Sequence, residues 1–385
     1  MKKLIVNPFF QKGFPTENGK DPVSTDVEAV RKLLAMCPVA AETPLVTSDT
    51  LARNLGINKL WLKDERNRMG LGSFKALGAT FVIASHAASK VRKEKTDDDW
   101  KKSLSGETYV SASAGNHGLS LAAGARIFGA KAVIYLSKNV PSTFADRIRS
   151  YGAGVVIHGD DYEESLQGAQ DAAQENNWFL LSDVTWDGYD YGLQVMQGYL
   201  VLAAEAYDKC SEMPTHIFLQ AGVGGMASGV IAGVARYFKR IPKIIIVEPK
   251  NADCVLKSID AGKLTRVEIE KESIMGGMSC GDVSLVPWQI LKNSVNNCLS
   301  IPDDEIPLSV AMLAKGYFGD DSIVAGECSA PALISINVSC NNEQIKKDLE
   351  LNMNSNVLLI GCEGDTDIKL YNELLSKGSE QLSNG

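Results

Sequence analysis

Short apolar runs alternate with amphipathic stretches along this chain, and this alternation limits the possible folds more than any other feature. The runs are rich in β-branched residues, and both KIIIV at 243–247 and NVLLI at 356–360 are continuously apolar. Strands of this kind are buried by helices on both faces of a parallel sheet. Because hairpin turns are few, the pattern predicts an α/β fold with mainly parallel sheets flanked by helices.

The same periodicity predicts where the elements lie. Strands are expected at 59–62, 107–111, 131–137, 154–158, 178–181, 215–219, 243–247 and 356–360. Helices are expected at 73–90, 117–129, 142–151, 163–176, 191–208 and 226–239, and 339–355 is expected to be a polar surface excursion. The 385 residues exceed one ordinary domain. We therefore expect a large lobe, 1–78 with 209–385, and a small inserted lobe, 79–208.

Charge and cysteine usage narrow the class of protein. The net charge is −8 and is spread along the chain, which argues against nucleic acid or an anionic membrane as partner. Asn7 and Pro8 interrupt the opening apolar run, and no stretch reaches the roughly 18 apolar residues of a membrane span. The eight cysteines form no CxxC and no zinc-like cluster. We expect a cytoplasmic enzyme with reduced thiols and no metal site.

A glycine turn follows the strand expected at 215–219 and precedes a helix that begins with small residues. Backbone N–H groups of such a turn can bind a phosphate dianion, and glycine lets the backbone approach it closely. A second interpretation stays open, because Gly222, Gly224 and Ala227 also satisfy G-x-G-x-x-G/A. Glu248 ends the next strand, where a nucleotide-binding oxidoreductase would hold a ribose.

Three further motifs stand at comparable places. Lys75, in MGLGSFKALGAT, begins an expected helix and could form a Schiff base if its amine is buried. SASAGNHG at 111–118 lies between a strand and a helix and could offer donors to a carboxylate. GCEGDTD at 361–367 is an acidic turn that directly follows the last expected strand. Each motif alone is also compatible with a solvated helix or a turn without a ligand.

Taken in order, these motifs resemble the fold type II pyridoxal-phosphate enzymes, which include the serine/threonine dehydratases and the tryptophan synthase β-subunit. Within that group the chain resembles diaminopropionate ammonia-lyase from its N-terminal third to near its C-terminus. The stretches that carry the resemblance are KDERNRMGLGSFKALGA (63–79), DVTWDGYDYGLQVMQGY (183–199), AGVGGMASGV (221–230), IIIVEPKNADC (244–254), IMGGMSCGD (274–282), AGECSA (325–330) and EGDTD (363–367).

The resemblance implies a residue set for pyridoxal 5'-phosphate. Lys75 corresponds to the lysine that holds the cofactor as a Schiff base, and Asn116 to the residue that hydrogen-bonds its ring hydroxyl. The phosphate would be held by Gly222, Val223, Gly224, Gly225 and Met226. Glu327 and Cys362 fall where the family's chain passes the pyridine nitrogen. The family usually has a hydroxyl side chain in that turn, so Gly361-Cys362 departs from the pattern and leaves the partner of the nitrogen open.

The resemblance also implies a substrate side. The substrate carboxylate would be received by Ser113, Ala114, Gly115, Asn116 and His117. Asp183 matches an acidic residue that lines the substrate side of the family's site. The family pattern has an aspartate immediately before GNH, associated with taking the α-proton of the D-isomer, and this chain has Ala114 there. We therefore expect a preference for L-substrates.

The implied reaction is the α,β-elimination of L-2,3-diaminopropionate to pyruvate and ammonia. Lys75 would take the Cα proton, and Asp183 would either protonate the leaving β-amine or bind it as an ammonium group. Because of Ala114, an L-serine/L-threonine ammonia-lyase of the same fold remains the alternative. The cofactor would lie between the two lobes, as ligands do at domain junctions, and the family suggests a homodimer. Cys254 and Cys280 could approach each other, but we expect two reduced thiols.

Overall fold

The computed structural model describes residues 3–11, 14, 23–94, 100–113, 115–140, 142–189, 191–319 and 321–384. The chain divides into two compact units, of which unit 1 comprises 1–25, 42–67 and 200–385. Unit 2 comprises 26–41 and 68–199. The boundaries after residues 67 and 199 lie earlier in the chain than the expected boundaries after residues 78 and 208. The helix expected at 191–208 is interrupted at 198–199, and its second half packs on a helix of unit 1.

Unit 1 is built on a seven-stranded sheet. Its strands, in spatial order, are β1 (Lys3–Val6), β10 (Asn297–Ile301), β9 (Lys243–Pro249), β8 (His216–Gln220), β11 (Asn356–Gly361), β3 (Lys59–Asp64) and β2 (Leu45–Thr47). The inner strands run parallel, and only the two edge strands are antiparallel to their neighbours. The inner strands are buried almost throughout, as strands covered on both faces must be.

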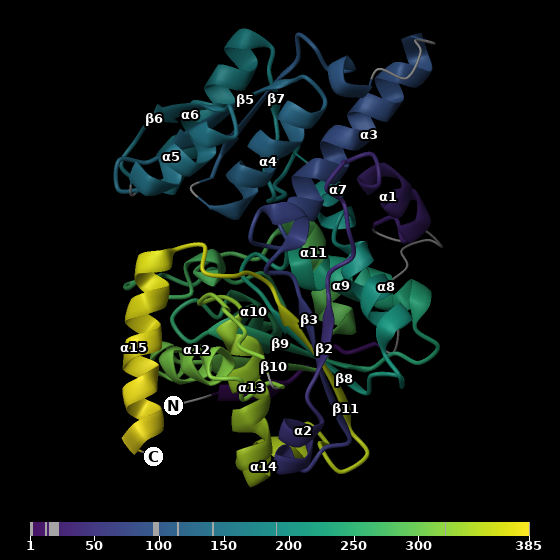
Figure 1. Ribbon diagram of the computed structural model, residues 1–385, viewed down its shortest axis with the longest axis vertical. Coiled ribbons are helices and arrows are strands. Elements are labelled where there is room, and N and C mark those ends of the chain that lie inside the picture. The colour runs from purple at the N-terminus through teal and green to yellow at the C-terminus, as the bar shows by residue number, and fades with distance from the viewer. Residues whose placement is uncertain are drawn as a thin grey trace. The chain divides into compact units, whose positions relative to one another are not determined.

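Helices surround the sheet of unit 1 (Figure 1). They are α2 (Asp49–Leu55), α8 (Leu200–Lys209), α9 (Gly225–Tyr237), α10 (Cys254–Ala261), α11 (Leu285–Ser294), α12 (Ile306–Ala314), α13 (Ala330–Asn341), α14 (Glu343–Asp348) and α15 (Ile368–Asn384), with 3-10 turns at η3 (Gly276–Met278) and η4 (Asp303–Glu305). α15 packs along α12. A Cβ at Gly378 would lie 1.8 Å from the Pro307 carbonyl oxygen, so this close packing requires glycine.

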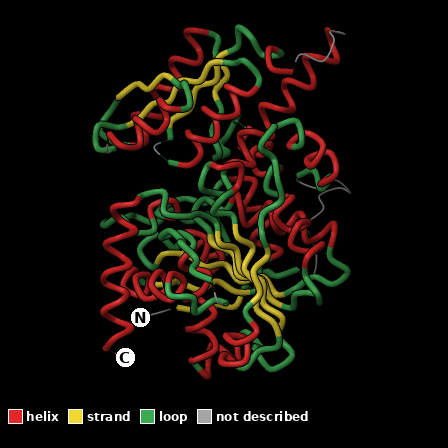
Figure 2. Tube along the Cα trace, in the orientation of Figure 1, coloured by secondary structure: helices red, strands yellow, loops and turns green. Residues whose placement is uncertain are grey.

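Unit 2 has its own, fully parallel sheet. Its strands, in spatial order, are β6 (Gly154–Ile157), β5 (Lys131–Leu136), β4 (Thr108–Ala112) and β7 (Phe179–Leu180). The strands of both sheets are drawn in yellow in Figure 2. The helices of unit 2 are α1 (Val27–Leu34), α3 (Ala76–Glu94), α4 (Asn116–Ile127), α5 (Ser142–Ser150), α6 (Tyr162–Asn176) and α7 (Tyr191–Gln197), with 3-10 turns at η1 (Arg68–Gly70) and η2 (Trp100–Lys102). α1 packs on α3, which explains why 26–41 belongs to unit 2.

The α/β fold with mainly parallel sheets is confirmed, and each expected strand is present within two residues. Three strands were not expected, namely β1, β2 and β10. The expectation for 339–355 was wrong in part, because α13 continues to Asn341 and α14 follows it. Within the described ranges, no helix combines the length and apolarity needed to cross a bilayer.

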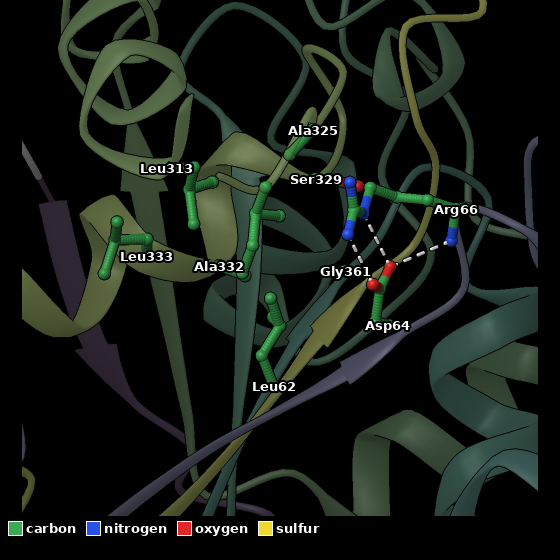
Figure 3. A pocket seen from close by; sticks show the side chains of 10 residues that line it. Leu62, Asp64, Arg66, Leu313, Ala325, Ser329, Ala332, Leu333 and Gly361 are labelled. Atoms are coloured by element: carbon green, nitrogen blue, oxygen red, sulfur yellow. Dashed lines mark hydrogen bonds and ion pairs between the residues drawn. The ribbon is translucent and has the colours of Figure 1, made fainter. Parts of the chain in front are cut away.

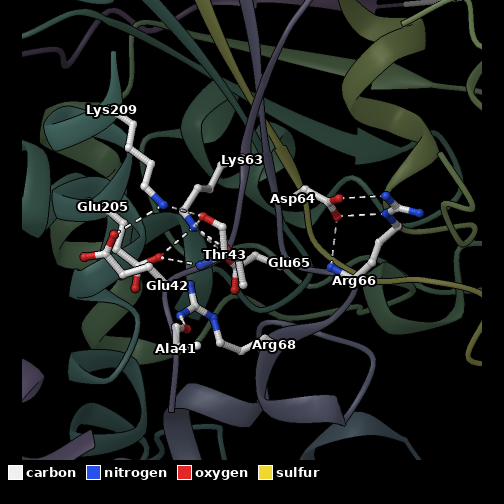
Figure 4. A network of polar contacts seen from close by, with 10 residues as sticks. All are labelled: Ala41, Glu42, Thr43, Lys63, Asp64, Glu65, Arg66, Arg68, Glu205 and Lys209. Atoms are coloured by element: carbon white, nitrogen blue, oxygen red, sulfur yellow. Dashed lines mark hydrogen bonds and ion pairs between the residues drawn. The ribbon is translucent and has the colours of Figure 1, made fainter. Parts of the chain in front are cut away.

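A buried ionic cluster connects three segments of unit 1 (Figure 4). Lys63 on β3 is fully buried, and its Nζ lies 3.1 Å from Glu65 Oε1 and 2.6 Å from Glu205 Oε2 on α8. The same ammonium donates to the Thr43 carbonyl oxygen at 3.0 Å. Removing one member of such a cluster leaves buried charge uncompensated.

We predict that Lys63→Met destabilises unit 1 by about 3–5 kcal/mol, because Glu65 and Glu205 would lose their buried counter-ion. Thermal unfolding followed by circular dichroism should show a clear fall in the midpoint. Lys59→Met is the matched control on the same strand, because Lys59 pairs with Asp49 at the surface at 3.2 Å. The control should cost less than about 1 kcal/mol. Equal midpoints for the two variants would contradict the prediction.

Candidate active site

Lys75 lies in the turn before α3 and forms an ion pair within unit 2. Its Nζ is 2.5 Å from Asp183 Oδ2, and the two side chains are 27% and 19% exposed. Gly78 makes room beside this pair, because a Cβ there would lie 2.8 Å from the Tyr199 hydroxyl. The Tyr199 ring packs edge-on against Phe74, with centroids 4.9 Å apart. The structure thus brings together two residues, Lys75 and Asp183, that are far apart in the sequence.

The closeness of Lys75 and Asp183 determines the charge of the Asp183 carboxyl. Burial alone would raise the pKa of the Asp183 carboxyl, but the Lys75 ammonium and His117 outweigh burial and hold that pKa well below its usual range. Burial raises the pKa of the neighbouring Tyr199 phenol, so that side chain stays neutral. Asp183 is therefore a carboxylate at neutral pH and presents a negative charge.

The GNHG motif forms the start of α4. Gly115 is the N-cap, and no described side chain caps the helix, so its first N–H groups can face an anion. A Cβ at Gly118 would lie 2.6 Å from the Ser113 carbonyl oxygen, so glycine allows the loop to fold over the first turn. His117 Nε2 lies 2.9 Å from the Leu181 carbonyl oxygen. The position of Ala114 lies outside the described residues.

The glycine turn of unit 1 has the geometry of an anion site. Gly224 is the N-cap of α9 with φ of +93°, and no side chain in the described part of the chain caps this helix. A Cβ at Gly224 would lie 2.7 Å from Leu291 Cδ1, and one at Gly222 would lie 2.9 Å from Cys280 Sγ. The backbone N–H groups at the start of α9, around Gly225 and Met226, can thus bind a phosphate, which fits the predicted cofactor.

Glu248 does not serve as a ribose ligand in this structure. It is fully buried at the end of β9, and its carboxyl oxygens accept hydrogen bonds from the backbone N–H groups of Val255 at 2.7 Å and Leu256 at 2.8 Å. Burial raises the pKa of the Glu248 carboxyl to about 8. The carboxyl group thus caps α10, so the nucleotide-binding interpretation loses the residue it needs.

Glu327 and Cys362 come together near the C-terminal ends of β8 and β11. Burial, followed by the nearby Glu363, raises the pKa of both the Glu327 carboxyl and the Cys362 thiol. Ser329, which the sequence did not single out, places its Oγ 3.7 Å from Cys362 Sγ. The family usually has a hydroxyl side chain in the turn at Gly361-Cys362. Here the Ser329 hydroxyl, from a different turn, lies beside that position. The sequence signal for Ser329 is its place in AGECSA (325–330), two residues after Glu327.

The same region gathers three residues whose ligand atoms lie within 4.8 Å of one another, namely Glu327, Cys328 and Glu363. Their spacing along the chain gave no sign of this cluster. Burial, with Glu363 and Glu327 nearby, raises the pKa of the Cys328 thiol well above its ordinary value. A neutral thiol is a poor metal ligand. Cys254 and Cys280 are free thiols in this structure.

A small apolar pocket of unit 1 adjoins the Cys362 region through Ser329 and Gly361 (Figure 3). Leu62, Leu313 and Leu333 line it, together with Ser329 and several small residues. Asp64 and Arg66 close one edge through a bidentate pair, with Nε and Nη2 at 2.8 and 2.7 Å from the carboxylate oxygens. The pocket contains neither Glu327 nor Cys362, and its apolar lining offers little to a charged cofactor.

Comparison with known proteins identifies the family. A family model described as "Pyridoxal-phosphate dependent enzyme" matches residues 37–363. Diaminopropionate ammonia-lyase of Escherichia coli K12 is 34% identical over 353 residues, which cover 89% of each chain. The crystal structure of the holo enzyme from E. coli superposes with a TM-score of 0.88 and 30% identity, covering 98% of this chain and 97% of that chain. A second E. coli structure, with an aminoacrylate-PLP azomethine reaction intermediate, gives a TM-score of 0.87 at 31% identity over the same shares. The chain therefore belongs to the pyridoxal-phosphate-dependent enzymes and, within them, to the diaminopropionate ammonia-lyase family.

Proposed function

We propose that this protein catalyses the pyridoxal-phosphate-dependent α,β-elimination of L-2,3-diaminopropionate to pyruvate and ammonia. The observation that carries the proposal is the ion pair of Lys75 and Asp183, beside the uncapped start of α4. The family relationship and the reaction intermediate held by the E. coli enzyme support it. We also propose, from the family resemblance, that the enzyme is a cytoplasmic homodimer.

The family resemblance assigns a cofactor-binding role to several residues. Lys75 would hold the cofactor covalently, Asn116 would bind its ring hydroxyl, and the N–H groups from Gly222 to Met226 would bind its phosphate. Glu327 and Cys362 would lie toward its pyridine nitrogen, with Ser329 beside them. When bound, the cofactor supplies an electron sink for the negative charge that develops at Cα. The neutral Cys362 thiol is a weak donor, which is sufficient for β-elimination.

Lys75 and Asp183 have different roles in the proposed elimination. The amine of Lys75, in its free form, would remove the Cα proton of the substrate. A β-amine leaves only in its protonated form. In its ionised form Asp183 stabilises the β-ammonium group by charge, and this cation takes the place of the Lys75 ammonium that favours the carboxylate in this structure.

The ionised Asp183 also favours the amine substrate over the alternative. A serine or threonine hydroxyl carries no charge, so it cannot pair with the Asp183 carboxylate as a β-ammonium group can. The substrate carboxylate would bind at the start of α4, where the N–H groups and the helix dipole attract anions. Ser113, Ala114, Gly115, Asn116 and His117 form this proposed subsite. These assignments support diaminopropionate over an L-serine or L-threonine ammonia-lyase.

The first test is the reaction and its lysine. The purified holoenzyme should be yellow and should release pyruvate from L-2,3-diaminopropionate faster than from L-serine, and faster than it releases 2-ketobutyrate from L-threonine. Borohydride should fix the cofactor on the peptide that contains Lys75, which mass spectrometry can identify. Lys75→Ala should eliminate turnover. Fixation on another lysine, or a preference for L-serine, would refute the proposal.

A second test separates the roles of Asp183. Asp183→Asn removes the charge while it keeps a similar shape, so kcat for L-2,3-diaminopropionate should fall by about 10²-fold or more. Turnover of L-serine, if measurable, should fall much less, because a hydroxyl makes no use of the charge. Steady-state kinetics with both substrates provide the measurement. A parallel fall for both substrates would show that Asp183 acts on a step the two share.

A third test concerns the phosphate turn. Gly224→Ala should raise the Kd for pyridoxal 5'-phosphate by about tenfold, because a positive φ costs roughly 1–2 kcal/mol for alanine. Fluorescence titration of the apoenzyme with cofactor measures this change. Gly154→Ala is the control, because a Cβ at Gly154 meets only ordinary contacts at 3.8 Å. An unchanged Kd for Gly224→Ala would argue against phosphate binding at this turn.

A fourth test concerns stereochemistry. Ala114→Asp should raise turnover of D-2,3-diaminopropionate by about tenfold or more, because a positioned base is worth roughly 10²–10⁴ in rate. Pyruvate release from the two enantiomers gives the ratio before and after the change. Ala114→Ser tests whether any polar side chain has the same effect. Unchanged discrimination in Ala114→Asp would remove position 114 from the explanation.

A further inference from the structure

Hydrogen bonds from Tyr189 hold the backbone that carries Asp183. The Tyr189 hydroxyl accepts a hydrogen bond from the Ser182 N–H at 2.8 Å and donates one to the Leu180 carbonyl oxygen at 3.2 Å. Ser182 directly precedes Asp183. On the other side of Asp183, the Val184 N–H donates to Ser182 Oγ at 3.3 Å. The backbone is therefore bonded on both sides of the residue that carries the carboxylate.

A tight turn fixes the position of Tyr189 itself. Trp186 and Tyr189 exchange backbone hydrogen bonds, with N···O distances of 3.2 and 3.0 Å. Between them Gly188 has φ of +81°, which glycine adopts without strain. The Trp186 and Tyr189 rings stack, with centroids 4.1 Å apart and planes inclined at 12°. The turn and the stack together determine where the phenol can reach, which gives the WDGY sequence at 186–189 a structural explanation.

The phenol suits this position because it can donate and accept a hydrogen bond at once. Burial raises the pKa of the Tyr189 phenol, so the hydroxyl keeps the proton that it donates to Leu180. Ser182 is 1% exposed, so its N–H has little access to water as a replacement partner. A buried N–H that loses its partner is costly, and the backbone relaxes to satisfy it. Loss of the hydroxyl would therefore allow the segment before Asp183 to shift.

The exact position of Asp183 matters because its contact is short. The carboxylate oxygen lies 2.5 Å from the Lys75 ammonium nitrogen. Charge-assisted hydrogen bonds depend on such distances, and a displacement of about 1 Å within a site can reduce a rate by about 10²-fold. A residue that holds the Asp183 backbone can therefore affect the reaction without touching the substrate.

We propose that Tyr189 is a positioning residue, whose hydroxyl holds Asp183 where the carboxylate can reach the β-ammonium group of the substrate. This role rests on the proposed function, in which Asp183 binds that group by charge. Tyr189 would then contribute to the choice between an amine and a hydroxyl at the β-position, and it would do so through Asp183 alone.

The other anchors of this segment bind a different residue. The Leu181 N–H donates to the Val110 carbonyl oxygen at 2.9 Å, and the Leu181 carbonyl oxygen lies 2.9 Å from His117 Nε2. These bonds attach Leu181 to β4 and α4. Of these anchors, Tyr189 is the one that bonds a residue adjacent to Asp183. Tyr189→Phe thus removes one anchor and leaves those at Leu181 in place.

The first measurement tests this anchor in the apoenzyme, without cofactor or substrate. Tyr189→Phe removes the hydroxyl and keeps the aromatic ring, so the Ser182 amide hydrogen should exchange with solvent about tenfold faster than in the wild type. Mass spectrometry with fragmentation to single residues gives this rate. Tyr109→Phe is the matched control, because it removes a hydroxyl of the same unit that bonds His86 Nδ1 at 2.9 Å. The control should leave the Ser182 rate within about twofold of the wild type.

The second measurement tests whether Tyr189 acts through Asp183. The α-methyl derivatives of L-2,3-diaminopropionate and L-serine have no Cα proton, so calorimetry on the holoenzyme gives their Kd values without turnover. Tyr189→Phe should lower the preference for the amine ligand about fivefold, whereas Tyr109→Phe should keep it within about twofold. In the Asp183→Asn background, Tyr189→Phe should change the preference by less than about twofold, because the charge that it positions is already absent. The ratio of the two Kd values within one variant corrects for any general loss of folding.

An unchanged Ser182 exchange rate in Tyr189→Phe would overturn the inference, because the hydroxyl would then not hold the segment. An unchanged preference in Tyr189→Phe, or a loss that persists in full with Asp183→Asn, would show that Tyr189 does not act through Asp183. An equal effect of Tyr109→Phe would assign the change to unit 2 in general. Failure of the wild-type enzyme to release pyruvate from L-2,3-diaminopropionate would instead refute the proposed function, and the exchange rates would still decide whether Tyr189 holds the segment. The two failures are thus distinguishable.

Discussion

The contact between the Lys75 ammonium and the Asp183 carboxylate is the interaction on which the proposed chemistry depends. It brings together residues that are far apart in the sequence, and it keeps the carboxyl ionised although burial opposes this. In the proposed reaction Lys75 is a neutral amine when it removes the Cα proton, so it then offers the carboxylate no positive charge. The carboxylate would need another cation, and a substrate with a second amino group would supply one. The pair would thus link the proposed catalytic lysine to the choice of substrate.

Each unit also presents a helix start that no side chain in the described ranges caps, shortly after a parallel strand. In unit 2, β4 leads through Ser113 and Gly115 into α4, and in unit 1, β8 leads through the glycine turn into α9. Both sites rely on backbone N–H groups, and each needs glycine at its closest approach. Such turns occur at the carboxyl ends of parallel strands, where ligands of α/β proteins bind. Two anions, a carboxylate and a phosphate, can therefore be bound by one type of local structure.

More of the fold than of the candidate site could be predicted from the sequence. Continuous apolar runs such as 243–247 marked the inner strands, because burial on both faces leaves little choice of residue. The sequence of β10, NCLSI, contains polar residues and cysteine, and only its burial between β1 and β9 makes it a strand. Tyr199 packs against Phe74 within unit 2, and Ser329 lies beside Cys362 within unit 1, through tertiary contacts that no local sequence pattern records. Glu248 fitted a ribose-binding motif until the structure placed its carboxylate on α10.

The buried cluster around Lys63 has a consequence for engineering this scaffold. Thr43, Lys63 and Glu65 belong to the 42–67 segment and Glu205 lies on α8, and residues 68–199 of unit 2 separate these two parts of the chain. A chimera that exchanges the region around Glu205 with a relative must therefore bring the matching 42–67 segment from the same parent. A single recombination breakpoint anywhere from residue 68 to residue 199 separates these partners and would yield mismatched charge in the interior of unit 1, whereas two breakpoints, one at each end of this range, keep them together.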